Sequence, residues 1–414
     1  MSRSDVADGV NAKLHELYPN RKDLKYHTVD FRWVGKLERG DTHWTSCERR
    51  AALRAFFGVT TDAELGLYPN RRTESRTKTT TNLDQPRTYE PSPLRPPASV
   101  DLAVIRASLD TFDLPPDGVI RSPAELNEAV AGLIRLRLRS NYQRLAIVLP
   151  SLLDELHRAQ IAWTGQRGSI ATLLLTQAYR AADALADKFG HHDLSARIIA
   201  MMTDAARRTG DATVLATAHY VRGELFFENG RPDLGRAVLE KAADEVSTCT
   251  GTFAWAAYGA LHMRAAVLAG IAQQSEQAKD HLREAGEYAQ LVSDGEYHGT
   301  AFGPSSVRIH EVTLAVDSDD PDAALRAARG WIPPNDLPGE RRSHFYIDLA
   351  RAHSQTRSTE PACDALFQAK LAAPEHARIH PQVRQVVSDL LPRVTAAHPL
   401  HDYVRWMTST AATG

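Results

Sequence analysis

From Asp101 to about Met407 the sequence carries one amphipathic helical pattern after another, and this feature restricts the possible folds more than any other. Leu, Ala, Val and Ile recur at i, i+3 and i+4 spacings, and no segment shows a convincing period-two alternation of apolar and polar residues. Turn signals interrupt the pattern at 114–118, Gly190, Gly230, Gly270, 318–321 and 358–361. The sequence therefore predicts an all-α fold.

Three of these glycines, Gly190, Gly230 and Gly270, lie 40 residues apart, an interval that indicates a helix-pair repeat. Two segments also follow the small–large–small spacing of a tetratricopeptide unit. Their residues are Gly223, Phe226, Gly230, Gly235, Leu239 and Ala242, and Leu349, Ala350, His353, Arg357, Ala362, Leu366, Ala369 and Pro374. We predict a degenerate tetratricopeptide-like helical-repeat array over 101–410. The alternative is an irregular bundle of helical hairpins, because Ala-rich helices readily offer small-residue spacings.

A second, smaller domain is predicted at residues 1–69, where short helical patterns alternate with turn signals. Between the two domains, residues 70–100 are rich in Thr, Pro and Arg, and up to Ser99 they contain only Leu83 and Leu94 from the large aliphatic residues. Such a segment buries too little apolar surface to offset its ordering entropy, so we expect a disordered linker. Residues 1–80 hold 15 Lys and Arg against 11 Asp and Glu, whereas the whole chain has a net charge of −2. A mildly basic N-terminal domain favours a nucleic-acid partner.

Two helix starts are recognisable in this domain. Ser2 followed by Asp5 has the spacing of a capping box, and Asp30 can cap a second helix that Gly40 can end in a left-handed conformation. The second segment resembles the recognition helix of the lambda-repressor and Cro (XRE-like) helix-turn-helix class. The matching residues are Val34, Gly35, Leu37, Glu38, Arg39 and Gly40. The residues 49–59 and 61–66 resemble the last two helices of that domain.

More narrowly, the chain resembles actinobacterial regulators that join such a domain to a tetratricopeptide-like region, and the likeness extends to 340–342 and 348–352. The resemblance implies a dimeric transcription factor that binds double-stranded DNA. It also implies that the repeat array mediates homodimer formation and senses a peptide, a small molecule or a protein.

The resemblance assigns DNA contacts to one helix face and its flank. The first residues of a recognition helix approach base edges, so Arg32 is expected to contact guanine and Phe31 a thymine methyl group. Other cations are expected to meet phosphates. The predicted DNA-contacting residues are Phe31, Arg32, Lys36, Arg39 and Arg49.

One departure from the family leaves two interpretations open. The family begins with a further helix behind the helix-turn-helix, whereas this sequence starts at what corresponds to the second helix. Either the natural start lies upstream of Met1, or the domain is incomplete. In the second case the chain is a protein-interaction scaffold with a degenerate helix-turn-helix that no longer binds DNA.

First helices of tetratricopeptide units line a concave surface, which is where a ligand or peptide is expected to bind. The candidate residues on these helices are His219, Tyr220, Arg222, His262, Arg264, Arg308 and His310.

Other functions are disfavoured by what the sequence lacks. It contains no phosphate-binding loop, no dinucleotide fingerprint, no nucleophile elbow and no zinc-protease motif, so we expect neither an enzyme nor a cofactor. His191 and His192 have no further ligand at metal-binding spacing, so no metal site is predicted there. The three cysteines are widely separated, and no apolar stretch is long enough to span a membrane. These features favour a cytoplasmic protein.

The predicted linker can be tested by limited proteolysis. Trypsin should cut the native protein first between about Arg71 and Arg95, because Arg and Lys are accessible in an unstructured segment. The cleavage sites can be identified by mass spectrometry. Early cuts within 140–290 would contradict the proposed division into domains.

Overall fold

The computed structural model of the chain describes residues 2–19, 24, 27–39, 45–59, 65, 67, 101–227 and 230–409. The predicted linker at 70–100 and the expected helix end at Gly40 lie outside these ranges. The described residues form nineteen α-helices and one two-stranded sheet, so the predicted all-α fold is confirmed. Within these ranges, no helix combines the length and apolar character that crossing a membrane requires.

Three helices form the N-terminal domain, namely α1 (Arg3–Leu17), α2 (Phe31–Glu38) and α3 (Cys47–Phe57). Both predicted helix starts are confirmed. The Ser2 hydroxyl accepts a hydrogen bond from the Asp5 amide while the Asp5 carboxylate accepts one from the Ser2 amide, and the Asp30 carboxylate accepts one from the Trp33 amide at 2.7 Å. A small apolar core holds the helices together, with Val10, Leu14, Val34 and Leu53 among its buried side chains.

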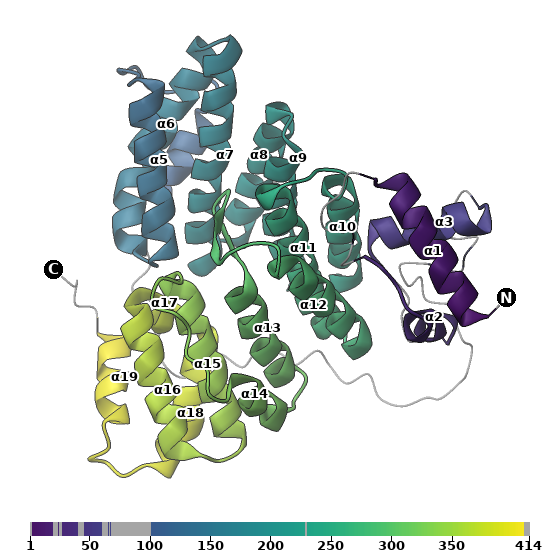
Figure 1. Cartoon of the computed structure of the whole chain (residues 1–414). Coiled ribbons are helices and arrows are strands. Elements are labelled where there is room, and N and C mark those ends of the chain that lie inside the picture. The colour runs from purple at the N-terminus through teal and green to yellow at the C-terminus, as the bar shows by residue number, and fades with distance from the viewer. Residues whose placement is uncertain are drawn as a thin grey trace, which may run out of the picture.

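The helical array follows (Figure 1), and most of its helices come in antiparallel pairs. It comprises α4 (Ala103–Asp110), α5 (Pro123–Leu138), α6 (Tyr142–Ala162), α7 (Gly165–Lys188), α8 (His192–Thr209), α9 (Ala212–Arg222), the 3-10 turn η3 (Gly223–Phe226), α10 (Pro232–Val246), α11 (Thr252–Ile271), α12 (Ser275–Ala289), α13 (Pro304–Asp317), α14 (Pro321–Ala328), α15 (Gly339–Gln355), α16 (Thr359–Ala372), α17 (Pro374–Ile379), α18 (Pro381–Leu390), η4 (Leu391–Arg393) and α19 (Leu400–Thr408).

The same turn joins the two helices of every pair from α5/α6 to α15/α16. A residue with positive φ lies two positions before the second helix, and these residues are Ser140, Gly190, Gly230, Gln273, Asp319 and Arg357. In the turns at Ser140, Gly190, Gln273, Asp319 and Arg357, the following amide donates a hydrogen bond of 2.8–3.0 Å to the carbonyl five residues earlier. This is the bond of a Schellman motif, which satisfies an otherwise unpaired carbonyl at the end of the first helix.

The turns correct the predicted repeat interval. Gly270 lies inside α11, and the left-handed residue of that pair is Gln273. The six turns are 50, 40, 43, 46 and 38 residues apart, so a fixed 40-residue spacing was wrong. Glycine occupies only two of the six left-handed positions, although this conformation costs other residues about 1–2 kcal/mol of conformational free energy. Glycine spacing therefore cannot locate the other turns.

The pairs stack so that each first helix contacts the first helix of the next pair, from α5 through α7, α9, α11 and α13 to α15. These six helices form what we call the inner layer of the array. A β-hairpin, β1 (Gly295–Tyr297) and β2 (Thr300–Phe302), lies between α12 and α13 in the sequence and packs on α11 and α13. The sequence patterns missed it because strands of three residues are too short to show alternation.

Two helical glycines provide a matched test of this packing. A Cβ atom at Gly235 in α10 would lie 2.5 Å from Phe226 Cβ, whereas a Cβ at Gly132 in α5 would have nothing nearer than 3.9 Å. Gly235→Ala should lower the free energy of unfolding by about 1–3 kcal/mol because of overpacking. Gly132→Ala should leave it unchanged or raise it by up to about 1 kcal/mol, since Ala favours helix. Denaturant unfolding of both variants checks this, and equal effects would contradict the packing at Gly235.

Candidate functional site

The predicted DNA-contacting face of α2 is accessible. Phe31 is 54% exposed, and Arg32, Lys36 and Arg39 are also exposed. Val34 points into the domain core, as the motif register requires. The carboxylate of Glu38 at the end of α2 pairs with Arg3 Nε of α1 at 2.6 Å. A negative charge next to the basic face is therefore partly neutralised.

Arg49 differs from the other four predicted DNA contacts, because the structure buries it. Its guanidinium lies 3.7 Å from the carboxylate of Glu287 in α12, and its Nε donates to the His27 carbonyl at 3.1 Å. Only 8% of the residue is exposed. Arg49 was predicted to contact a phosphate, but in the structure α3 packs against the array. The Arg49 guanidinium is directed at the array and is not available to DNA in this arrangement.

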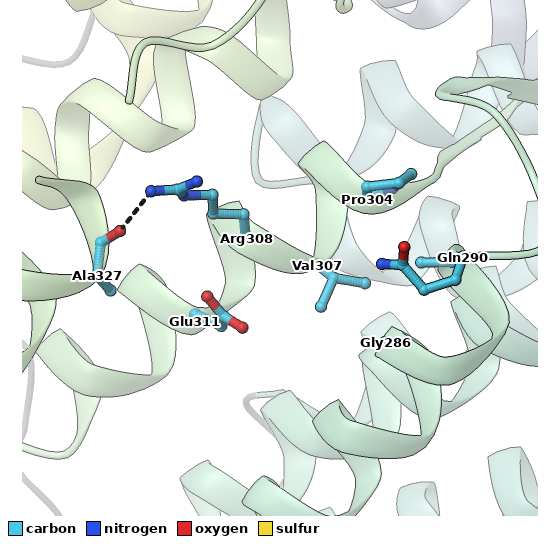
Figure 2. Close-up of a pocket in the computed structure, with 8 residues that line it drawn as sticks. Gly286, Gln290, Pro304, Val307, Arg308, Glu311 and Ala327 are labelled. Carbon is cyan, nitrogen blue, oxygen red and sulfur yellow. Dashed lines mark hydrogen bonds between the residues drawn. The ribbon is translucent and has the colours of Figure 1, made fainter. Parts of the chain in front are cut away.

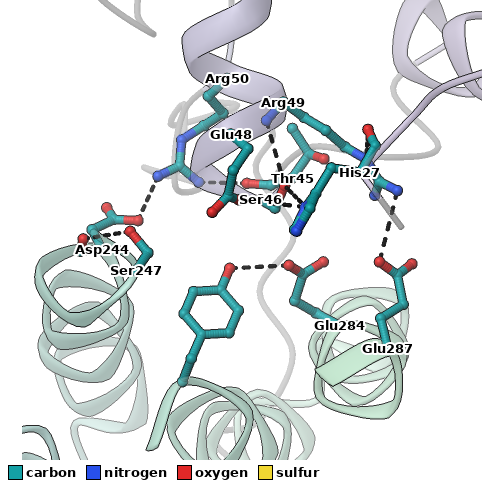
Figure 3. Close-up of polar contacts among 11 residues, drawn as sticks. His27, Thr45, Ser46, Glu48, Arg49, Arg50, Asp244, Ser247, Glu284 and Glu287 are labelled. Atoms are coloured by element: carbon teal, nitrogen blue, oxygen red, sulfur yellow. Dashed lines mark hydrogen bonds and ion pairs between the residues drawn. The ribbon is translucent and has the colours of Figure 1, made fainter. Parts of the chain in front are cut away.

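Arg49 belongs to a polar contact between the N-terminal domain and the array, which Figure 3 shows. We call this contact the clasp and define it as His27, Glu48, Arg49 and Arg50 facing Asp244, Glu284, Glu287 and Tyr288. Arg50, which is 4% exposed, donates to the carboxylate of Asp244 in α10 and to the Thr45 carbonyl.

Neighbouring groups complete the clasp. The His27 ring stacks edge-on against Tyr288 with centroids 5.9 Å apart, and the Tyr258 hydroxyl of α11 donates to Glu284 at 3.0 Å. Burial and the nearby Glu284 raise the pKa of the Glu287 carboxyl, while Arg49 partly opposes this shift. Sequence patterns do not reveal this contact, because its two sides lie about 200 residues apart.

The inner layer carries a second polar cluster. Each of its six helices contributes one basic or aromatic residue to a row that we call the inner row: Arg137, Arg180, Tyr220, Arg264, His310 and Arg341. Tyr220, Arg264 and His310 were predicted on this surface. The other three were missed, although the spacing from Arg137 to Arg180 to Tyr220 follows the repeat interval and is a signal that could have found them.

Tyr220 is the centre of the inner row. Arg341 Nη2 donates to its hydroxyl at 3.0 Å, and the Arg264 guanidinium stacks on its ring 4.0 Å from the centroid. Arg264 also pairs with Glu224 at 2.9 Å. Burial alone would raise the pKa of the Tyr220 hydroxyl, but Arg264, Arg341 and Arg180 lower it to about 7. The three arginines therefore favour the tyrosinate form.

The β-hairpin covers part of the inner row. The Gly299 carbonyl at its tip accepts hydrogen bonds from Arg137 and, at 3.2 Å, from Arg180 Nε. His298 Nε2 is 2.9 Å from the Thr213 hydroxyl. The space left between the hairpin, α9 and α11 is only about 10 Å³ and is lined by Tyr220, Tyr297 and Phe302 among others. This volume is close to the minimum for one water molecule, so the hairpin fills the groove here.

The other predicted groove residues lie elsewhere. His262 Nδ1 is 3.0 Å from His281 Nδ1, and His281 Nε2 is 3.1 Å from Glu240, so His262 faces the second helices. The charges nearest His219 include Glu245 and Lys241 of α10, away from the inner row. Arg222 is one of the charges that lower the pKa of His219.

Arg308 lines a separate pocket of about 330 Å³ between α12, α13 and α14 (Figure 2). It donates to the Ala327 carbonyl at 3.4 Å, and its guanidinium carbon lies 5.0 Å from the centroid of the Trp331 ring. Glu311 lies on the same wall, and burial raises the pKa of its carboxyl. The predicted groove residues therefore divide between the inner row and other sites.

The ionisation of Tyr220 predicts a pH dependence. Ultraviolet titration of the native protein should reveal one tyrosinate forming near pH 7, and Tyr220→Phe should remove it. An unfolded tyrosine keeps its proton up to about pH 10. Between these values the unfolded state binds more protons, so the stability of the wild type relative to Tyr220→Phe should rise with pH. A difference in stability that stays flat from about pH 7 to 10 would contradict the arrangement.

Comparisons with known proteins give a similarity at the level of structure. No protein-family model matches the chain, and no curated protein matches it. Among solved structures, the crystal structure of BtubC (BKLC) from P. vanneervenii is similar, with 16% sequence identity and a TM-score of 0.36. The alignment covers 60% of this chain and 90% of that chain. A likeness at this TM-score carries no argument about function.

Proposed function

We propose that this chain is a sequence-specific DNA-binding transcriptional regulator of the cytoplasm, acting as a homodimer. The observation that carries the proposal is the exposed face of α2, where Phe31, Arg32, Lys36 and Arg39 are accessible while Val34 is buried. This helix begins at an Asp cap, and its first turn presents an aromatic ring and a guanidinium together.

The residue types on α2 fit groove recognition. Arg32 can donate two hydrogen bonds to guanine, and the exposed Phe31 ring can contact a thymine methyl group. Lys36 and Arg39 follow along the helix, where phosphates position a recognition helix without reading sequence. An exposed ring of this size has no role in the core of the domain, because the small core is formed by other side chains.

The array is proposed to sense an acidic ligand or the acidic terminus of a peptide. In the structure Arg137 and Arg180 of the inner row donate to a carbonyl oxygen, that of Gly299. Arg341 donates to the Tyr220 hydroxyl, and Arg264 stacks on the Tyr220 ring. A carboxylate or phosphate would bind such donors more strongly than a neutral carbonyl does. Because the hairpin fills the groove, this ligand would have to displace the hairpin tip.

DNA binding can be tested by fluorescence anisotropy, using an operator selected from random duplex and several salt concentrations. Arg32→Ala should weaken operator binding by about 1–3 kcal/mol and relax the preference at one base pair. Lys36→Ala should weaken binding to all sequences more evenly. It should also reduce the slope of log affinity against log salt by about one unit per protomer, because one phosphate contact is lost.

Two further variants serve as controls. Arg135→Ala removes an exposed cation on α5 and should change neither affinity nor slope. Arg49→Ala removes a cation from the same domain, but it should leave the slope unchanged because Arg49 is buried in the clasp. If the wild type prefers no selected sequence over random duplex at about 100 mM salt, the chain is not a sequence-specific regulator, and the interaction scaffold becomes the better proposal.

A further inference from the structure

Three histidines converge near the C-terminal end of the inner layer. His344 lies on α15, His376 on α17, and His380 at the junction of α17 and α18. Their ring centroids are 5.5, 5.0 and 5.0 Å apart, so the three rings form a nearly equilateral triangle. One ring nitrogen from each histidine lies within 4.8 Å of one from each of the others. Among the described residues, this is the one such group of three potential metal ligands.

Each ring has a buried nitrogen that lacks a hydrogen-bond partner. These atoms are Nδ1 of His344, Nε2 of His376 and Nδ1 of His380. Buried polar atoms are almost always satisfied, so three unsatisfied nitrogens on three neighbouring rings require an explanation. They cannot all satisfy one another, because no hydrogen bond joins any two of the rings in the structure. A cation at the centre would accept all three lone pairs.

The surroundings favour a cation over a purely structural cluster. The other nitrogen of His376, Nδ1, lies 3.0 Å from the hydroxyl of the buried Ser343, which fixes the ring so that Nε2 is the atom left for a ligand. Metal-bound histidines are typically oriented in this way by a hydrogen bond from their second nitrogen.

Neighbouring charges largely cancel. Lys188 faces the cluster but pairs with Glu340 at 3.3 Å, and Arg351 pairs with Asp317 at 2.8 Å and with Asp348 at 2.9 Å. Arg341 faces His344 and is bound to Tyr220. These pairs leave no large excess of positive charge to repel a divalent cation.

We propose that His344, His376 and His380 form a binding site for a divalent transition-metal ion, with Zn²⁺ as the best match. Neutral imidazole nitrogen suits zinc, and three protein ligands leave a fourth tetrahedral position open to water or an anion. Zinc–nitrogen bonds of about 2.1 Å place the ligand nitrogens about 3.4 Å apart. Small side-chain rotations bring nitrogens from within 4.8 Å to that separation. The site does not depend on DNA binding.

The test is titration of the chelator-treated full-length protein with zinc chloride by isothermal calorimetry. One equivalent should bind per chain, with a dissociation constant below about 10 μM. His376→Gln and His380→Gln should each weaken binding at least about 100-fold. Ser343→Ala should weaken it about 10–100-fold, because the orienting hydrogen bond to His376 is lost. The matched control is His353→Gln, a half-buried histidine on α15 outside the cluster, which should bind zinc like the wild type.

Two additional measurements separate ligand loss from misfolding. Far-ultraviolet circular dichroism should show wild-type helicity for all four variants, and zinc should raise the thermal midpoint of the wild type but not of His380→Gln. If the His variants fail to fold, X-ray absorption of the zinc-loaded wild type should still show three imidazole ligands. Absence of stoichiometric binding, wild-type affinity in the His376→Gln or His380→Gln variant, or fewer than three imidazole ligands would each overturn the proposal.

Discussion

The burial of α11 on nearly all its faces is the constraint on which the rest of the array depends. This helix contacts α9, α10, α12, α13 and both strands of the hairpin. A helix surrounded in this way must be apolar around its circumference. Many of its side chains must also be small, so that the neighbouring helices can approach closely. Its sequence meets both conditions, with Ala at seven of its 20 positions and Gly259 where the Phe302 ring of the hairpin packs.

The few polar side chains of α11 connect the two polar clusters of the molecule. Tyr258 reaches Glu284 in the clasp, whereas Arg264 stacks on Tyr220 in the inner row. One rigid helix therefore touches both the contact that holds the N-terminal domain and the surface proposed to receive a ligand. In the proposed regulator, coupling of ligand binding to DNA binding requires two arrangements of the array that the ligand binds with different affinities. In the structure the hairpin tip rests on Arg137 and Arg180, and a ligand that displaced it would select a second arrangement.

Features that depend on local sequence were predictable. The caps at Ser2 and Asp30 and the buried side of α2 follow from spacing alone, and so do Tyr220 and Arg264 on the inner layer. What could not be predicted depends on residues far apart in the sequence. Arg49 has the charge and the sequence position expected of a phosphate contact. Its inward direction is apparent only from its ion pair with Glu287 in α12.

The histidine triangle was missed for the same reason. His376 and His380 are close in sequence, but His344 joins them only because α15 packs against α17 and α18. Turn signals were predicted close to the last residues of α11 and α15, at Gly270 and 358–361, but the left-handed residues were not. Gln273 and Arg357 adopt a conformation that sequence rules reserve for glycine.

Burying the charged and polar side chains of the inner row costs hydration free energy. Arg180, Tyr220 and Arg264 lose most of their hydration, and burial together with Arg137 lowers the pKa of Arg180 to about 10. Buried ion pairs generally stabilise a fold no more than apolar side chains of the same size would. An apolar row would serve packing equally well, so stability does not account for these residues. Recognition of an anionic group, as proposed for the array, would account for them, because a ligand carboxylate or phosphate would supply the negative charge that the neutral carbonyl of Gly299 lacks.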